Sequence, residues 1–128
     1  MPGNVTRQIP GSSQEVGETT ECTTTSVVDV LVPGMTITPQ EGTYDIWFTG
    51  TGTNSLKGCA AVFSIYAAGV RIDESESVVE PGGNDFKGSF RCTARVEVNG
   101  TQAIEGKFKA GSNTAKVYAR TLLIRKVV

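Results

Sequence analysis

Two long stretches of strict alternation constrain the fold of this 128-residue chain more than any other feature of its sequence. In residues 43–53 the side chains of Tyr44, Ile46 and Phe48 occupy every second position. Residues 85–98 alternate in the same way between apolar and polar positions. A period of two residues is the period of a β-strand that buries one face. The sequence therefore predicts two long, half-buried strands.

Shorter runs rich in threonine, valine and other strand-forming residues fill most of the remaining chain. They cover residues 23–32, 35–38, 59–67, 70–79, 101–109 and 115–127. Turn signals separate the runs: Pro33-Gly34 predicts a turn, and Asn99-Gly100 predicts a two-stranded hairpin. Gly50 and Gly52 predict a bend or a close approach of two backbones. About eight evenly spaced strands with almost no helix predict an all-β fold, an antiparallel β-sandwich or jelly roll.

The first twenty residues differ from the rest of the chain. Residues 1–20 are polar, carry several prolines and glycines, and show neither helical nor strand periodicity. We interpret them as a short extended N-terminal arm that precedes one sandwich domain at residues 21–128. The arm is either a loose terminus or a tether that docks on a partner. The polarity of the segment favours a loose terminus, and the apolar residues Val5, Ile9 and Val16 favour a tether equally.

Composition and charge exclude several classes of function. The net charge of −1 lacks the basic excess that supplies most nucleic-acid affinity, so we expect no nucleic-acid partner. It also gives no reason to expect adhesion to an anionic membrane, and no apolar run approaches the roughly 20 residues that span a bilayer. The first residues lack the apolar core of a signal peptide, which predicts synthesis in a cytoplasm.

The residues that carry most enzyme chemistry are missing. The chain has no histidine, so serine–histidine and cysteine–histidine nucleophile pairs and the commonest metal ligand are absent from the sequence. Asp73, Glu74 and Glu76 could supply oxygen ligands to calcium, but neighbouring strand residues point to opposite faces, so we favour a solvated strand. The sequence predicts no catalytic residue, no metal and no cofactor, and therefore a protein that is not an enzyme.

The three cysteines Cys22, Cys59 and Cys92 are odd in number and widely spaced, which argues against a disulfide framework. We expect Cys59 and Cys92 to be buried, inert thiols, because both fall inside strand-like runs. Trp47 and Tyr66 each fall on the strand face away from their apolar neighbours. They are interpreted as subunit-contact residues or as a sugar-stacking platform, with the contact favoured.

Four segments of the sequence resemble a domain of bacteriophage virion proteins. Residues 42–50, with the glycine, small residue, tyrosine and apolar alternation of GTYDIWFTG, resemble its central strand. Residues 63–70 are similar to its hairpin, and residues 115–127 resemble its terminal strand. Ser75-Glu76 falls where the family often has a serine-glutamate-arginine step, but Ser77 stands in place of the arginine.

The resemblance, over residues 22–128, implies a jelly roll similar to tumour-necrosis-factor-like domains that forms a homotrimer. It implies one of two roles: a head decoration (cement) protein bound to the major capsid protein, or a tail-fibre or spike tip that binds a host receptor or carbohydrate. The short segment before the first strand favours decoration, with the protein made in the host cytoplasm and located on the virion capsid surface. We expect Val5, Arg7, Ile9 and Pro10 to form the capsid-anchoring arm.

The last strand supplies the expected trimer contact. Strict alternation places Val117, Leu123 and Val127 on one face and Tyr118, Leu122 and Ile124 on the other, so both faces are largely apolar. A sandwich strand with one face in water would normally be polar there. We therefore expect Trp47, Tyr118 and Leu122 to lie in the trimer interface.

Overall fold

All regular structure in the computed structural model, which describes residues 12–127, is β. The nine strands are β1 (Ser13–Glu18), β2 (Cys22–Thr24), β3 (Val30–Ile37), β4 (Gly42–Asn54), β5 (Ala61–Ala67), β6 (Val70–Val79), β7 (Gly88–Val98), β8 (Ile104–Ala110) and β9 (Ala115–Lys126). The all-β prediction is confirmed. Residues 12–127 contain no helix, and hence none that could cross a membrane.

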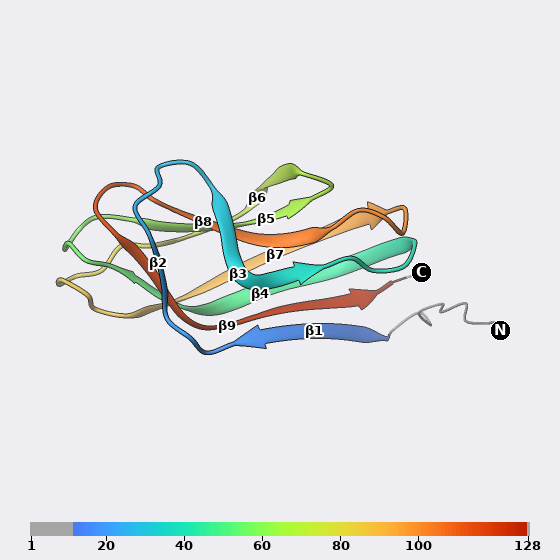
Figure 1. Ribbon diagram of the computed structural model, residues 1–128, viewed down its shortest axis with the longest axis horizontal. Helices are drawn as coiled ribbons and strands as arrows, with labels where there is room; N and C mark the ends of the chain where they lie inside the picture. The colour runs from blue at the N-terminus through green and yellow to red at the C-terminus, as the bar shows by residue number, and fades with distance from the viewer. Residues whose placement is uncertain (1–11, 128) are drawn as a thin grey trace.

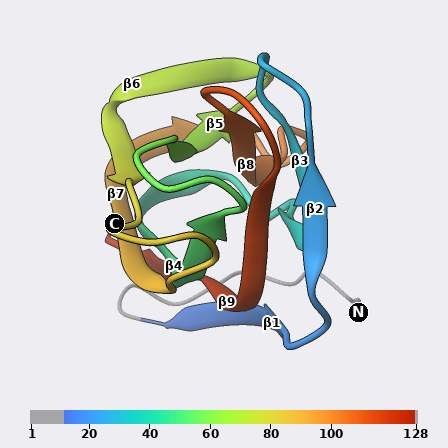
Figure 2. The ribbon, with the colours of Figure 1, turned by 90° about the vertical axis from the view of Figure 1, so that its left-hand side faces the viewer.

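The strands form two antiparallel sheets packed face to face (Figures 1 and 2). One sheet has the order β1-β9-β4-β7, with β2 also paired to β9, and the other has the order β3-β8-β5-β6. From β2 onward every connection passes from one sheet to the other, except the tight β5–β6 hairpin. This connectivity makes the sandwich a jelly roll.

Aromatic rings from both sheets fill the centre of the core. Phe48 and Phe90 come from one sheet, and Phe63 and Phe108 from the other. The rings of Phe63 and Phe90 stack across the sandwich with centroids 3.7 Å apart. The predicted inward face of the long alternating stretch is confirmed, because Tyr44, Ile46 and Phe48 are all buried.

A β-bulge in β9 changes which of its residues face the core. Gly50 is opposite Arg120 and Gly52 is opposite Val117, so β9 carries one residue more than β4 between these pairs. The backbones meet closely there: a Cβ atom on Gly50 would lie 2.6 Å from the carbonyl oxygen of Ala119. The close approach predicted from the glycines is therefore present.

The bulge overturns the expected phase of the last strand. An extra residue moves every later side chain to the opposite face of the sheet. As a result Val117, Leu122 and Ile124 all lie in the core, with no exposed surface on Leu122. The interface assignment of Leu122 was wrong, because this side chain packs inside its own chain. Tyr118 and Leu123 point outward and are half-buried.

The structure differs from the sequence prediction at two expected turns. Pro33-Gly34 lies inside β3, where the pairing with β8 is interrupted between Leu31 and Thr36. An irregularity of this kind accommodates a proline, which has no N–H to donate, and Gly34 adopts a φ of 86°. Asn99-Gly100 does turn the chain, but β7 pairs with β4 and β8 pairs with β3 and β5. The predicted hairpin was wrong, since local sequence defines a turn and not the partner of the strand that follows.

The boundary of the N-terminal arm also needs correction. Residues 13–18 form β1, which pairs with β9 from Ser13 opposite Arg125 to Glu18 opposite Arg120. Val16 packs against the core, so this segment belongs to the sandwich and not to a separate arm. The predicted anchor residues Val5, Arg7, Ile9 and Pro10 lie outside the described residues.

Candidate functional site

The outer face of the β1-β9-β4-β7 sheet is the first candidate surface. Strand pairing arranges its side chains in rows across the four strands. One row is Ser13, Arg125, Asp45 and Arg95; the next is Glu15, Leu123, Trp47 and Thr93; a third is Gly17, Thr121, Thr49 and Arg91. These rows enclose a shallow groove of about 690 Å³ with the Trp47 indole beside it. We call this surface the outer sheet face.

Charged side chains flank the indole on this face. Arg95 donates two hydrogen bonds to the Asp45 carboxylate, at 2.7 Å from Nε and 3.0 Å from Nη2. The hydrogen bond from Arg95 lowers the pKa of Asp45, and the charges of Arg95 and Arg125 act in the same direction. Trp47 is only half-buried, although it lies at the middle of the sheet. Aromatic residues and arginine are the residue types enriched in protein interfaces, and this face presents both.

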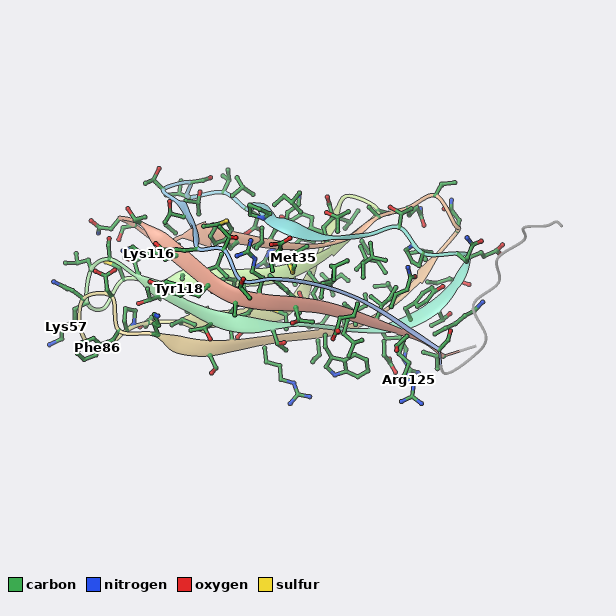
Figure 3. The ribbon with its side chains drawn as sticks, turned by 60° about the horizontal axis from the view of Figure 1, so that its bottom comes forward. Met35, Lys57, Phe86, Lys116, Tyr118 and Arg125 are labelled. Atoms are coloured by element: carbon green, nitrogen blue, oxygen red, sulfur yellow. The ribbon has the colours of Figure 1, made fainter. Side chains whose placement is uncertain are left out.

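Tyr118, the second predicted interface residue, lies on the same face but far from Trp47. Trp47 is opposite Leu123, and the five residue steps from Leu123 to Tyr118 span roughly 17 Å of strand. The Tyr118 ring lies beneath the ammonium group of Lys87, 4.2 Å from the ring centroid. Figure 3 places Tyr118 toward the loop end of the sandwich and Arg125 toward the opposite end. The structure thus keeps two of the three predicted contact residues on one face without bringing them together.

Tyr66 is on the other sheet and does not offer a free stacking surface. Its hydroxyl donates to Asp29 Oδ2 at 2.7 Å, and the Lys107 ammonium lies 4.1 Å from the ring centroid. Burial, together with the Asp29 hydrogen bond, raises the pKa of Tyr66 to about 12. Its role as a sugar platform is therefore not favoured, because both its hydroxyl and one ring face have partners within the chain.

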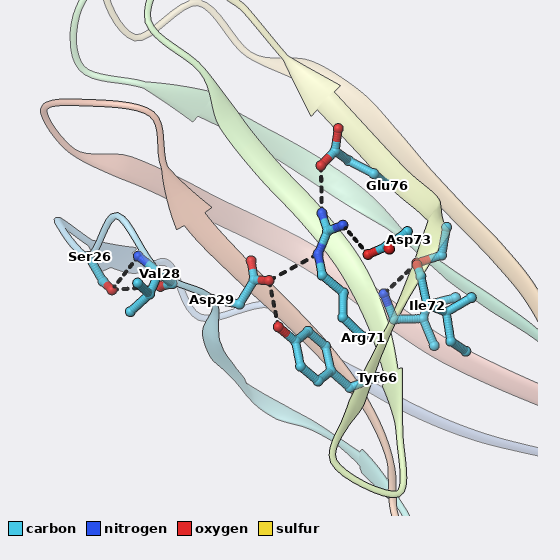
Figure 4. Close-up of polar contacts among 10 residues, drawn as sticks. Ser26, Val28, Asp29, Tyr66, Arg71, Ile72, Asp73 and Glu76 are labelled. Carbon is cyan, nitrogen blue, oxygen red and sulfur yellow. Dashed lines mark hydrogen bonds and ion pairs between the residues drawn. The ribbon is translucent and has the colours of Figure 1, made fainter.

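The acidic cluster of β6 is held by an arginine. Arg71 bonds to Asp29 at 3.1 Å, Asp73 at 2.9 Å and Glu76 at 2.5 Å (Figure 4). Among residues 12–127 no group of three acidic or cysteine side chains is placed to hold a metal ion. Asp29 is 7% exposed, and its contacts with Arg71 and Tyr66 fasten the segment before β3 to the outside of β5 and β6. This cluster joins elements of the fold.

All three cysteines are free thiols. Cys92 is buried, and desolvation raises its pKa to about 12, as expected for an inert thiol. Cys59 is half-exposed, contrary to the expectation of burial, since it lies in the loop just before β5. The hydroxyl of Ser112 donates to its sulfur at 3.0 Å.

A second candidate surface lies at the end of the sandwich away from the start of β1 and the end of β9 (Figures 1 and 3). Phe86 is 65% exposed there and Leu56 is 44% exposed. The two loops that carry them are joined by hydrogen bonds from Lys57 N to Asn84 Oδ1 and from Gly58 N to Pro81 O. We call this surface the loop tip.

Sequence reasoning missed the loop tip and Arg120. The sequence assigned Phe86 to the alternating stretch of residues 85–98, whereas β7 begins only at Gly88 and Phe86 lies in the loop before it. Arg120 had no signal in the sequence: it is buried, and its guanidinium donates to backbone carbonyls of Thr20, Tyr118 and Pro33. Only the bulge in β9 explains why a charged residue occupies a core position there.

No protein-family model matches the chain, and no curated protein matches it by sequence. Similar solved structures include the Eiger TNF from S. frugiperda, 10% identical, with a TM-score of 0.64 and 94% of each chain covered. A chain of infectious bursal disease virus, Gx strain, is 9% identical with a TM-score of 0.55, covering 88% of this chain and 32% of that chain. The chain thus spans about a third of the viral chain.

A third similar structure is the CBM36-1 domain of a multidomain xylanase from the hindgut metagenome of Trinervitermes trinervoides. It is 16% identical with a TM-score of 0.49, and the match covers 91% of this chain and 99% of that chain. At such low identities the likeness concerns the fold alone. The strand topology and the two structures with TM-scores of 0.64 and 0.55 define the class of the protein: a jelly-roll β-sandwich domain.

Proposed function

We propose that this chain is a virion structural protein, a homotrimeric head decoration (cement) protein that binds the capsid surface and stabilises it. The resemblance in sequence to bacteriophage virion domains supports the phage assignment and the trimer. Trimers fit local three-fold positions between capsomers, and three anchoring segments in one trimer add avidity to weak single contacts. In this proposal the protein acts by self-association and binding, and it carries out no reaction.

The outer sheet face carries the self-association part of the proposal. Within residues 12–127 no strand or loop covers Trp47 and Leu123, which are neighbours in the middle row. Tryptophan and arginine are enriched where proteins bind one another, and a half-buried indole becomes fully buried when a second chain packs on it. A trimer that uses this face would bury the indole and leave the loop tip free.

The oligomeric mass of the purified protein tests this step. Light scattering at micromolar concentration is expected to give the mass of three chains, and Trp47→Ser is expected to shift the mass toward one chain. Phe86→Ser is the matched control, because it removes an exposed aromatic ring from the loop tip and should leave the mass unchanged. A monomeric wild-type protein would contradict the proposal.

The capsid-binding part rests on the segment before β1, with Val5, Arg7, Ile9 and Pro10 as anchors. An extended segment with two apolar side chains, a cation and a proline can lie along a strand edge or in a groove of the major capsid protein. Because β1 begins at Ser13, the test deletes residues 2–11 and preserves the sheet. The shortened protein is expected to fold and associate normally but to lose binding to bare capsids. Equally tight binding by both forms would place the anchor elsewhere.

A receptor-binding tip is the second candidate function, and the loop tip favours it. Phe86 is held by a stiff loop: Asp85 adopts a φ of 61°, and the carbonyl of Phe86 accepts a hydrogen bond from Thr53 Oγ1 at 2.5 Å. A preorganised, exposed aromatic ring is a typical anchor for a ligand or partner. A glycan array separates the two functions. Specific binding that is lost in Phe86→Ala would support recognition, and copy number in virions comparable to that of the major capsid protein would support decoration.

A further inference from the structure

The outer sheet face carries an acidic side chain at one edge and a basic side chain at the other. Glu15 lies on the edge strand β1, and Arg91 lies on the opposite edge strand β7. Both side chains are exposed, and both line the groove beside Trp47. In the part of the chain that the structure describes, neither charge has an ion-pair partner, whereas Arg95 is paired with Asp45.

These two charges cannot reach each other within one chain. Three strand spacings separate β1 from β7, which is roughly 14 Å. The strands between them contribute Leu123, Trp47, Thr49 and Thr121, which carry no charge, and Arg125, which lies opposite Ser13 on the β1 side of the groove. Each edge therefore presents an unpaired charge to whatever packs against the face, and the two charges are opposite in sign.

We propose that this face binds a second copy of the same chain, with Glu15 of one subunit paired to Arg91 of the next. This inference rests on the proposed self-association and specifies its geometry. A ring of identical subunits brings two different patches of neighbouring chains together, and an acidic and a basic side chain at opposite edges of one face are complementary. The Trp47 indole and its neighbour Leu123 are covered in the same contact.

Charge reversal tests the pairing. Glu15→Arg and Arg91→Glu should each raise the dissociation constant of the assembly about tenfold at low salt, because each single change places like charges together. The double variant, with both reversals, should return the constant to near the wild-type value. Glu74→Arg, an exposed acidic residue of β6 in the other sheet, is the matched control and should have no effect.

A crosslinking experiment tests whether residues 15 and 91 of neighbouring chains lie close together, without a measurement of affinity. Glu15→Cys and Arg91→Cys proteins are mixed and oxidised, and a disulfide between the two chains is expected only in the mixture. Wild-type protein treated in the same way controls for the three native thiols. The Glu15–Arg91 pairing would be overturned if neither single reversal changed the dissociation constant, or if the double variant did not recover the wild-type constant. Self-association of the wild-type protein would still stand in either case. A monomeric wild-type protein would overturn both.

Discussion

At the scale of single residues, a few buried polar groups hold the irregular parts of the sandwich. Arg120 projects from the bulge in β9 and donates to the carbonyls of Thr20 and Pro33, which lie in the β1–β2 connection and in the irregular part of β3. Its second nitrogen also approaches the Cys22 sulfur at 3.4 Å. One side chain therefore satisfies carbonyl groups of the β1–β2 connection, of the irregular part of β3 and, through Tyr118, of the bulge itself.

Replacing Arg120 should expose the importance of these contacts. We expect Arg120→Met to lower the free energy of unfolding by about 3 kcal/mol, because it leaves several carbonyl groups buried without donors. Urea unfolding at fixed protein concentration measures the change. Lys57→Met, which removes one positive charge from an exposed loop, should stay within about 0.5 kcal/mol of wild type. A similar small effect of Arg120→Met would contradict this role.

Tyr66 gives a prediction about pH. Burial and the Asp29 hydrogen bond raise its pKa from 10.0 to about 12, so the folded state favours the neutral phenol. The stability that this preference contributes is complete below about pH 10 and is lost as the pH rises through about 12. Absorbance titration of tyrosinate should contain a component near pH 12 that Tyr66→Phe removes and Tyr118→Phe retains. Its persistence in Tyr66→Phe would refute the assignment.

At the scale of elements, β9 organises its sheet. It pairs with β1 and β4 along its length and with β2 near its start, and its bulge sets which face each residue takes. The edge strand β1 covers one side of β9 and contributes Val16 to the core. Unpaired sheet edges favour aggregation, so β1 also protects β9 from pairing with other chains.

Two deletions distinguish β1 from the residues before it. Removing residues 2–11 should leave the free energy of unfolding unchanged, because β1 begins at Ser13. Removing residues 2–18 should lower it by about 1–2 kcal/mol, since the burial of Val16 and the pairing with β9 are lost. Urea unfolding and light scattering measure stability and aggregation. Equal stability of the two shortened proteins would show that β1 adds nothing to the fold.

At the scale of the whole molecule, two sheets and a continuous core stabilise the chain without crosslinks. A chain of this length buries about two-thirds of its unfolded surface, which suffices for an independent domain. Its cysteines are free, and the stacked Phe63 and Phe90 join the two layers. The outer sheet face and the loop tip lie on different parts of this rigid body, so self-association and recognition can be altered separately.

The midpoint of thermal unfolding should not depend on reductant, because no disulfide constrains the chain. Calorimetry with and without a thiol reductant checks this. A fall of several degrees on adding reductant would reveal a stabilising disulfide and refute the free-thiol assignment. Alkylation measures the reactivity of the thiols directly. Cys59 should react in the folded protein, and Cys92 should react only after unfolding.

The sequence alone determined the class of fold, most of the strands and much of the core. Alternation is a local property, so the inward residues of β4 and the central part of β7 follow directly from their spacing. The same local pattern placed Trp47 on the outward face. Cys92 was predicted to be buried because it falls inside a strand-like run, and it is buried.

Only the tertiary structure decided which strands pair and where alternation breaks. The Asn99-Gly100 turn leads into the other sheet, where β8 pairs with β3 and β5, although β7 is an edge strand with one unpaired side. The bulge in β9 depends on Gly50 and the chain opposite it, and it moved Leu122 into the core. Contacts between segments distant in sequence carry no local signal, so periodicity could not reveal β1, Arg120 or the two charged edges of the outer sheet face.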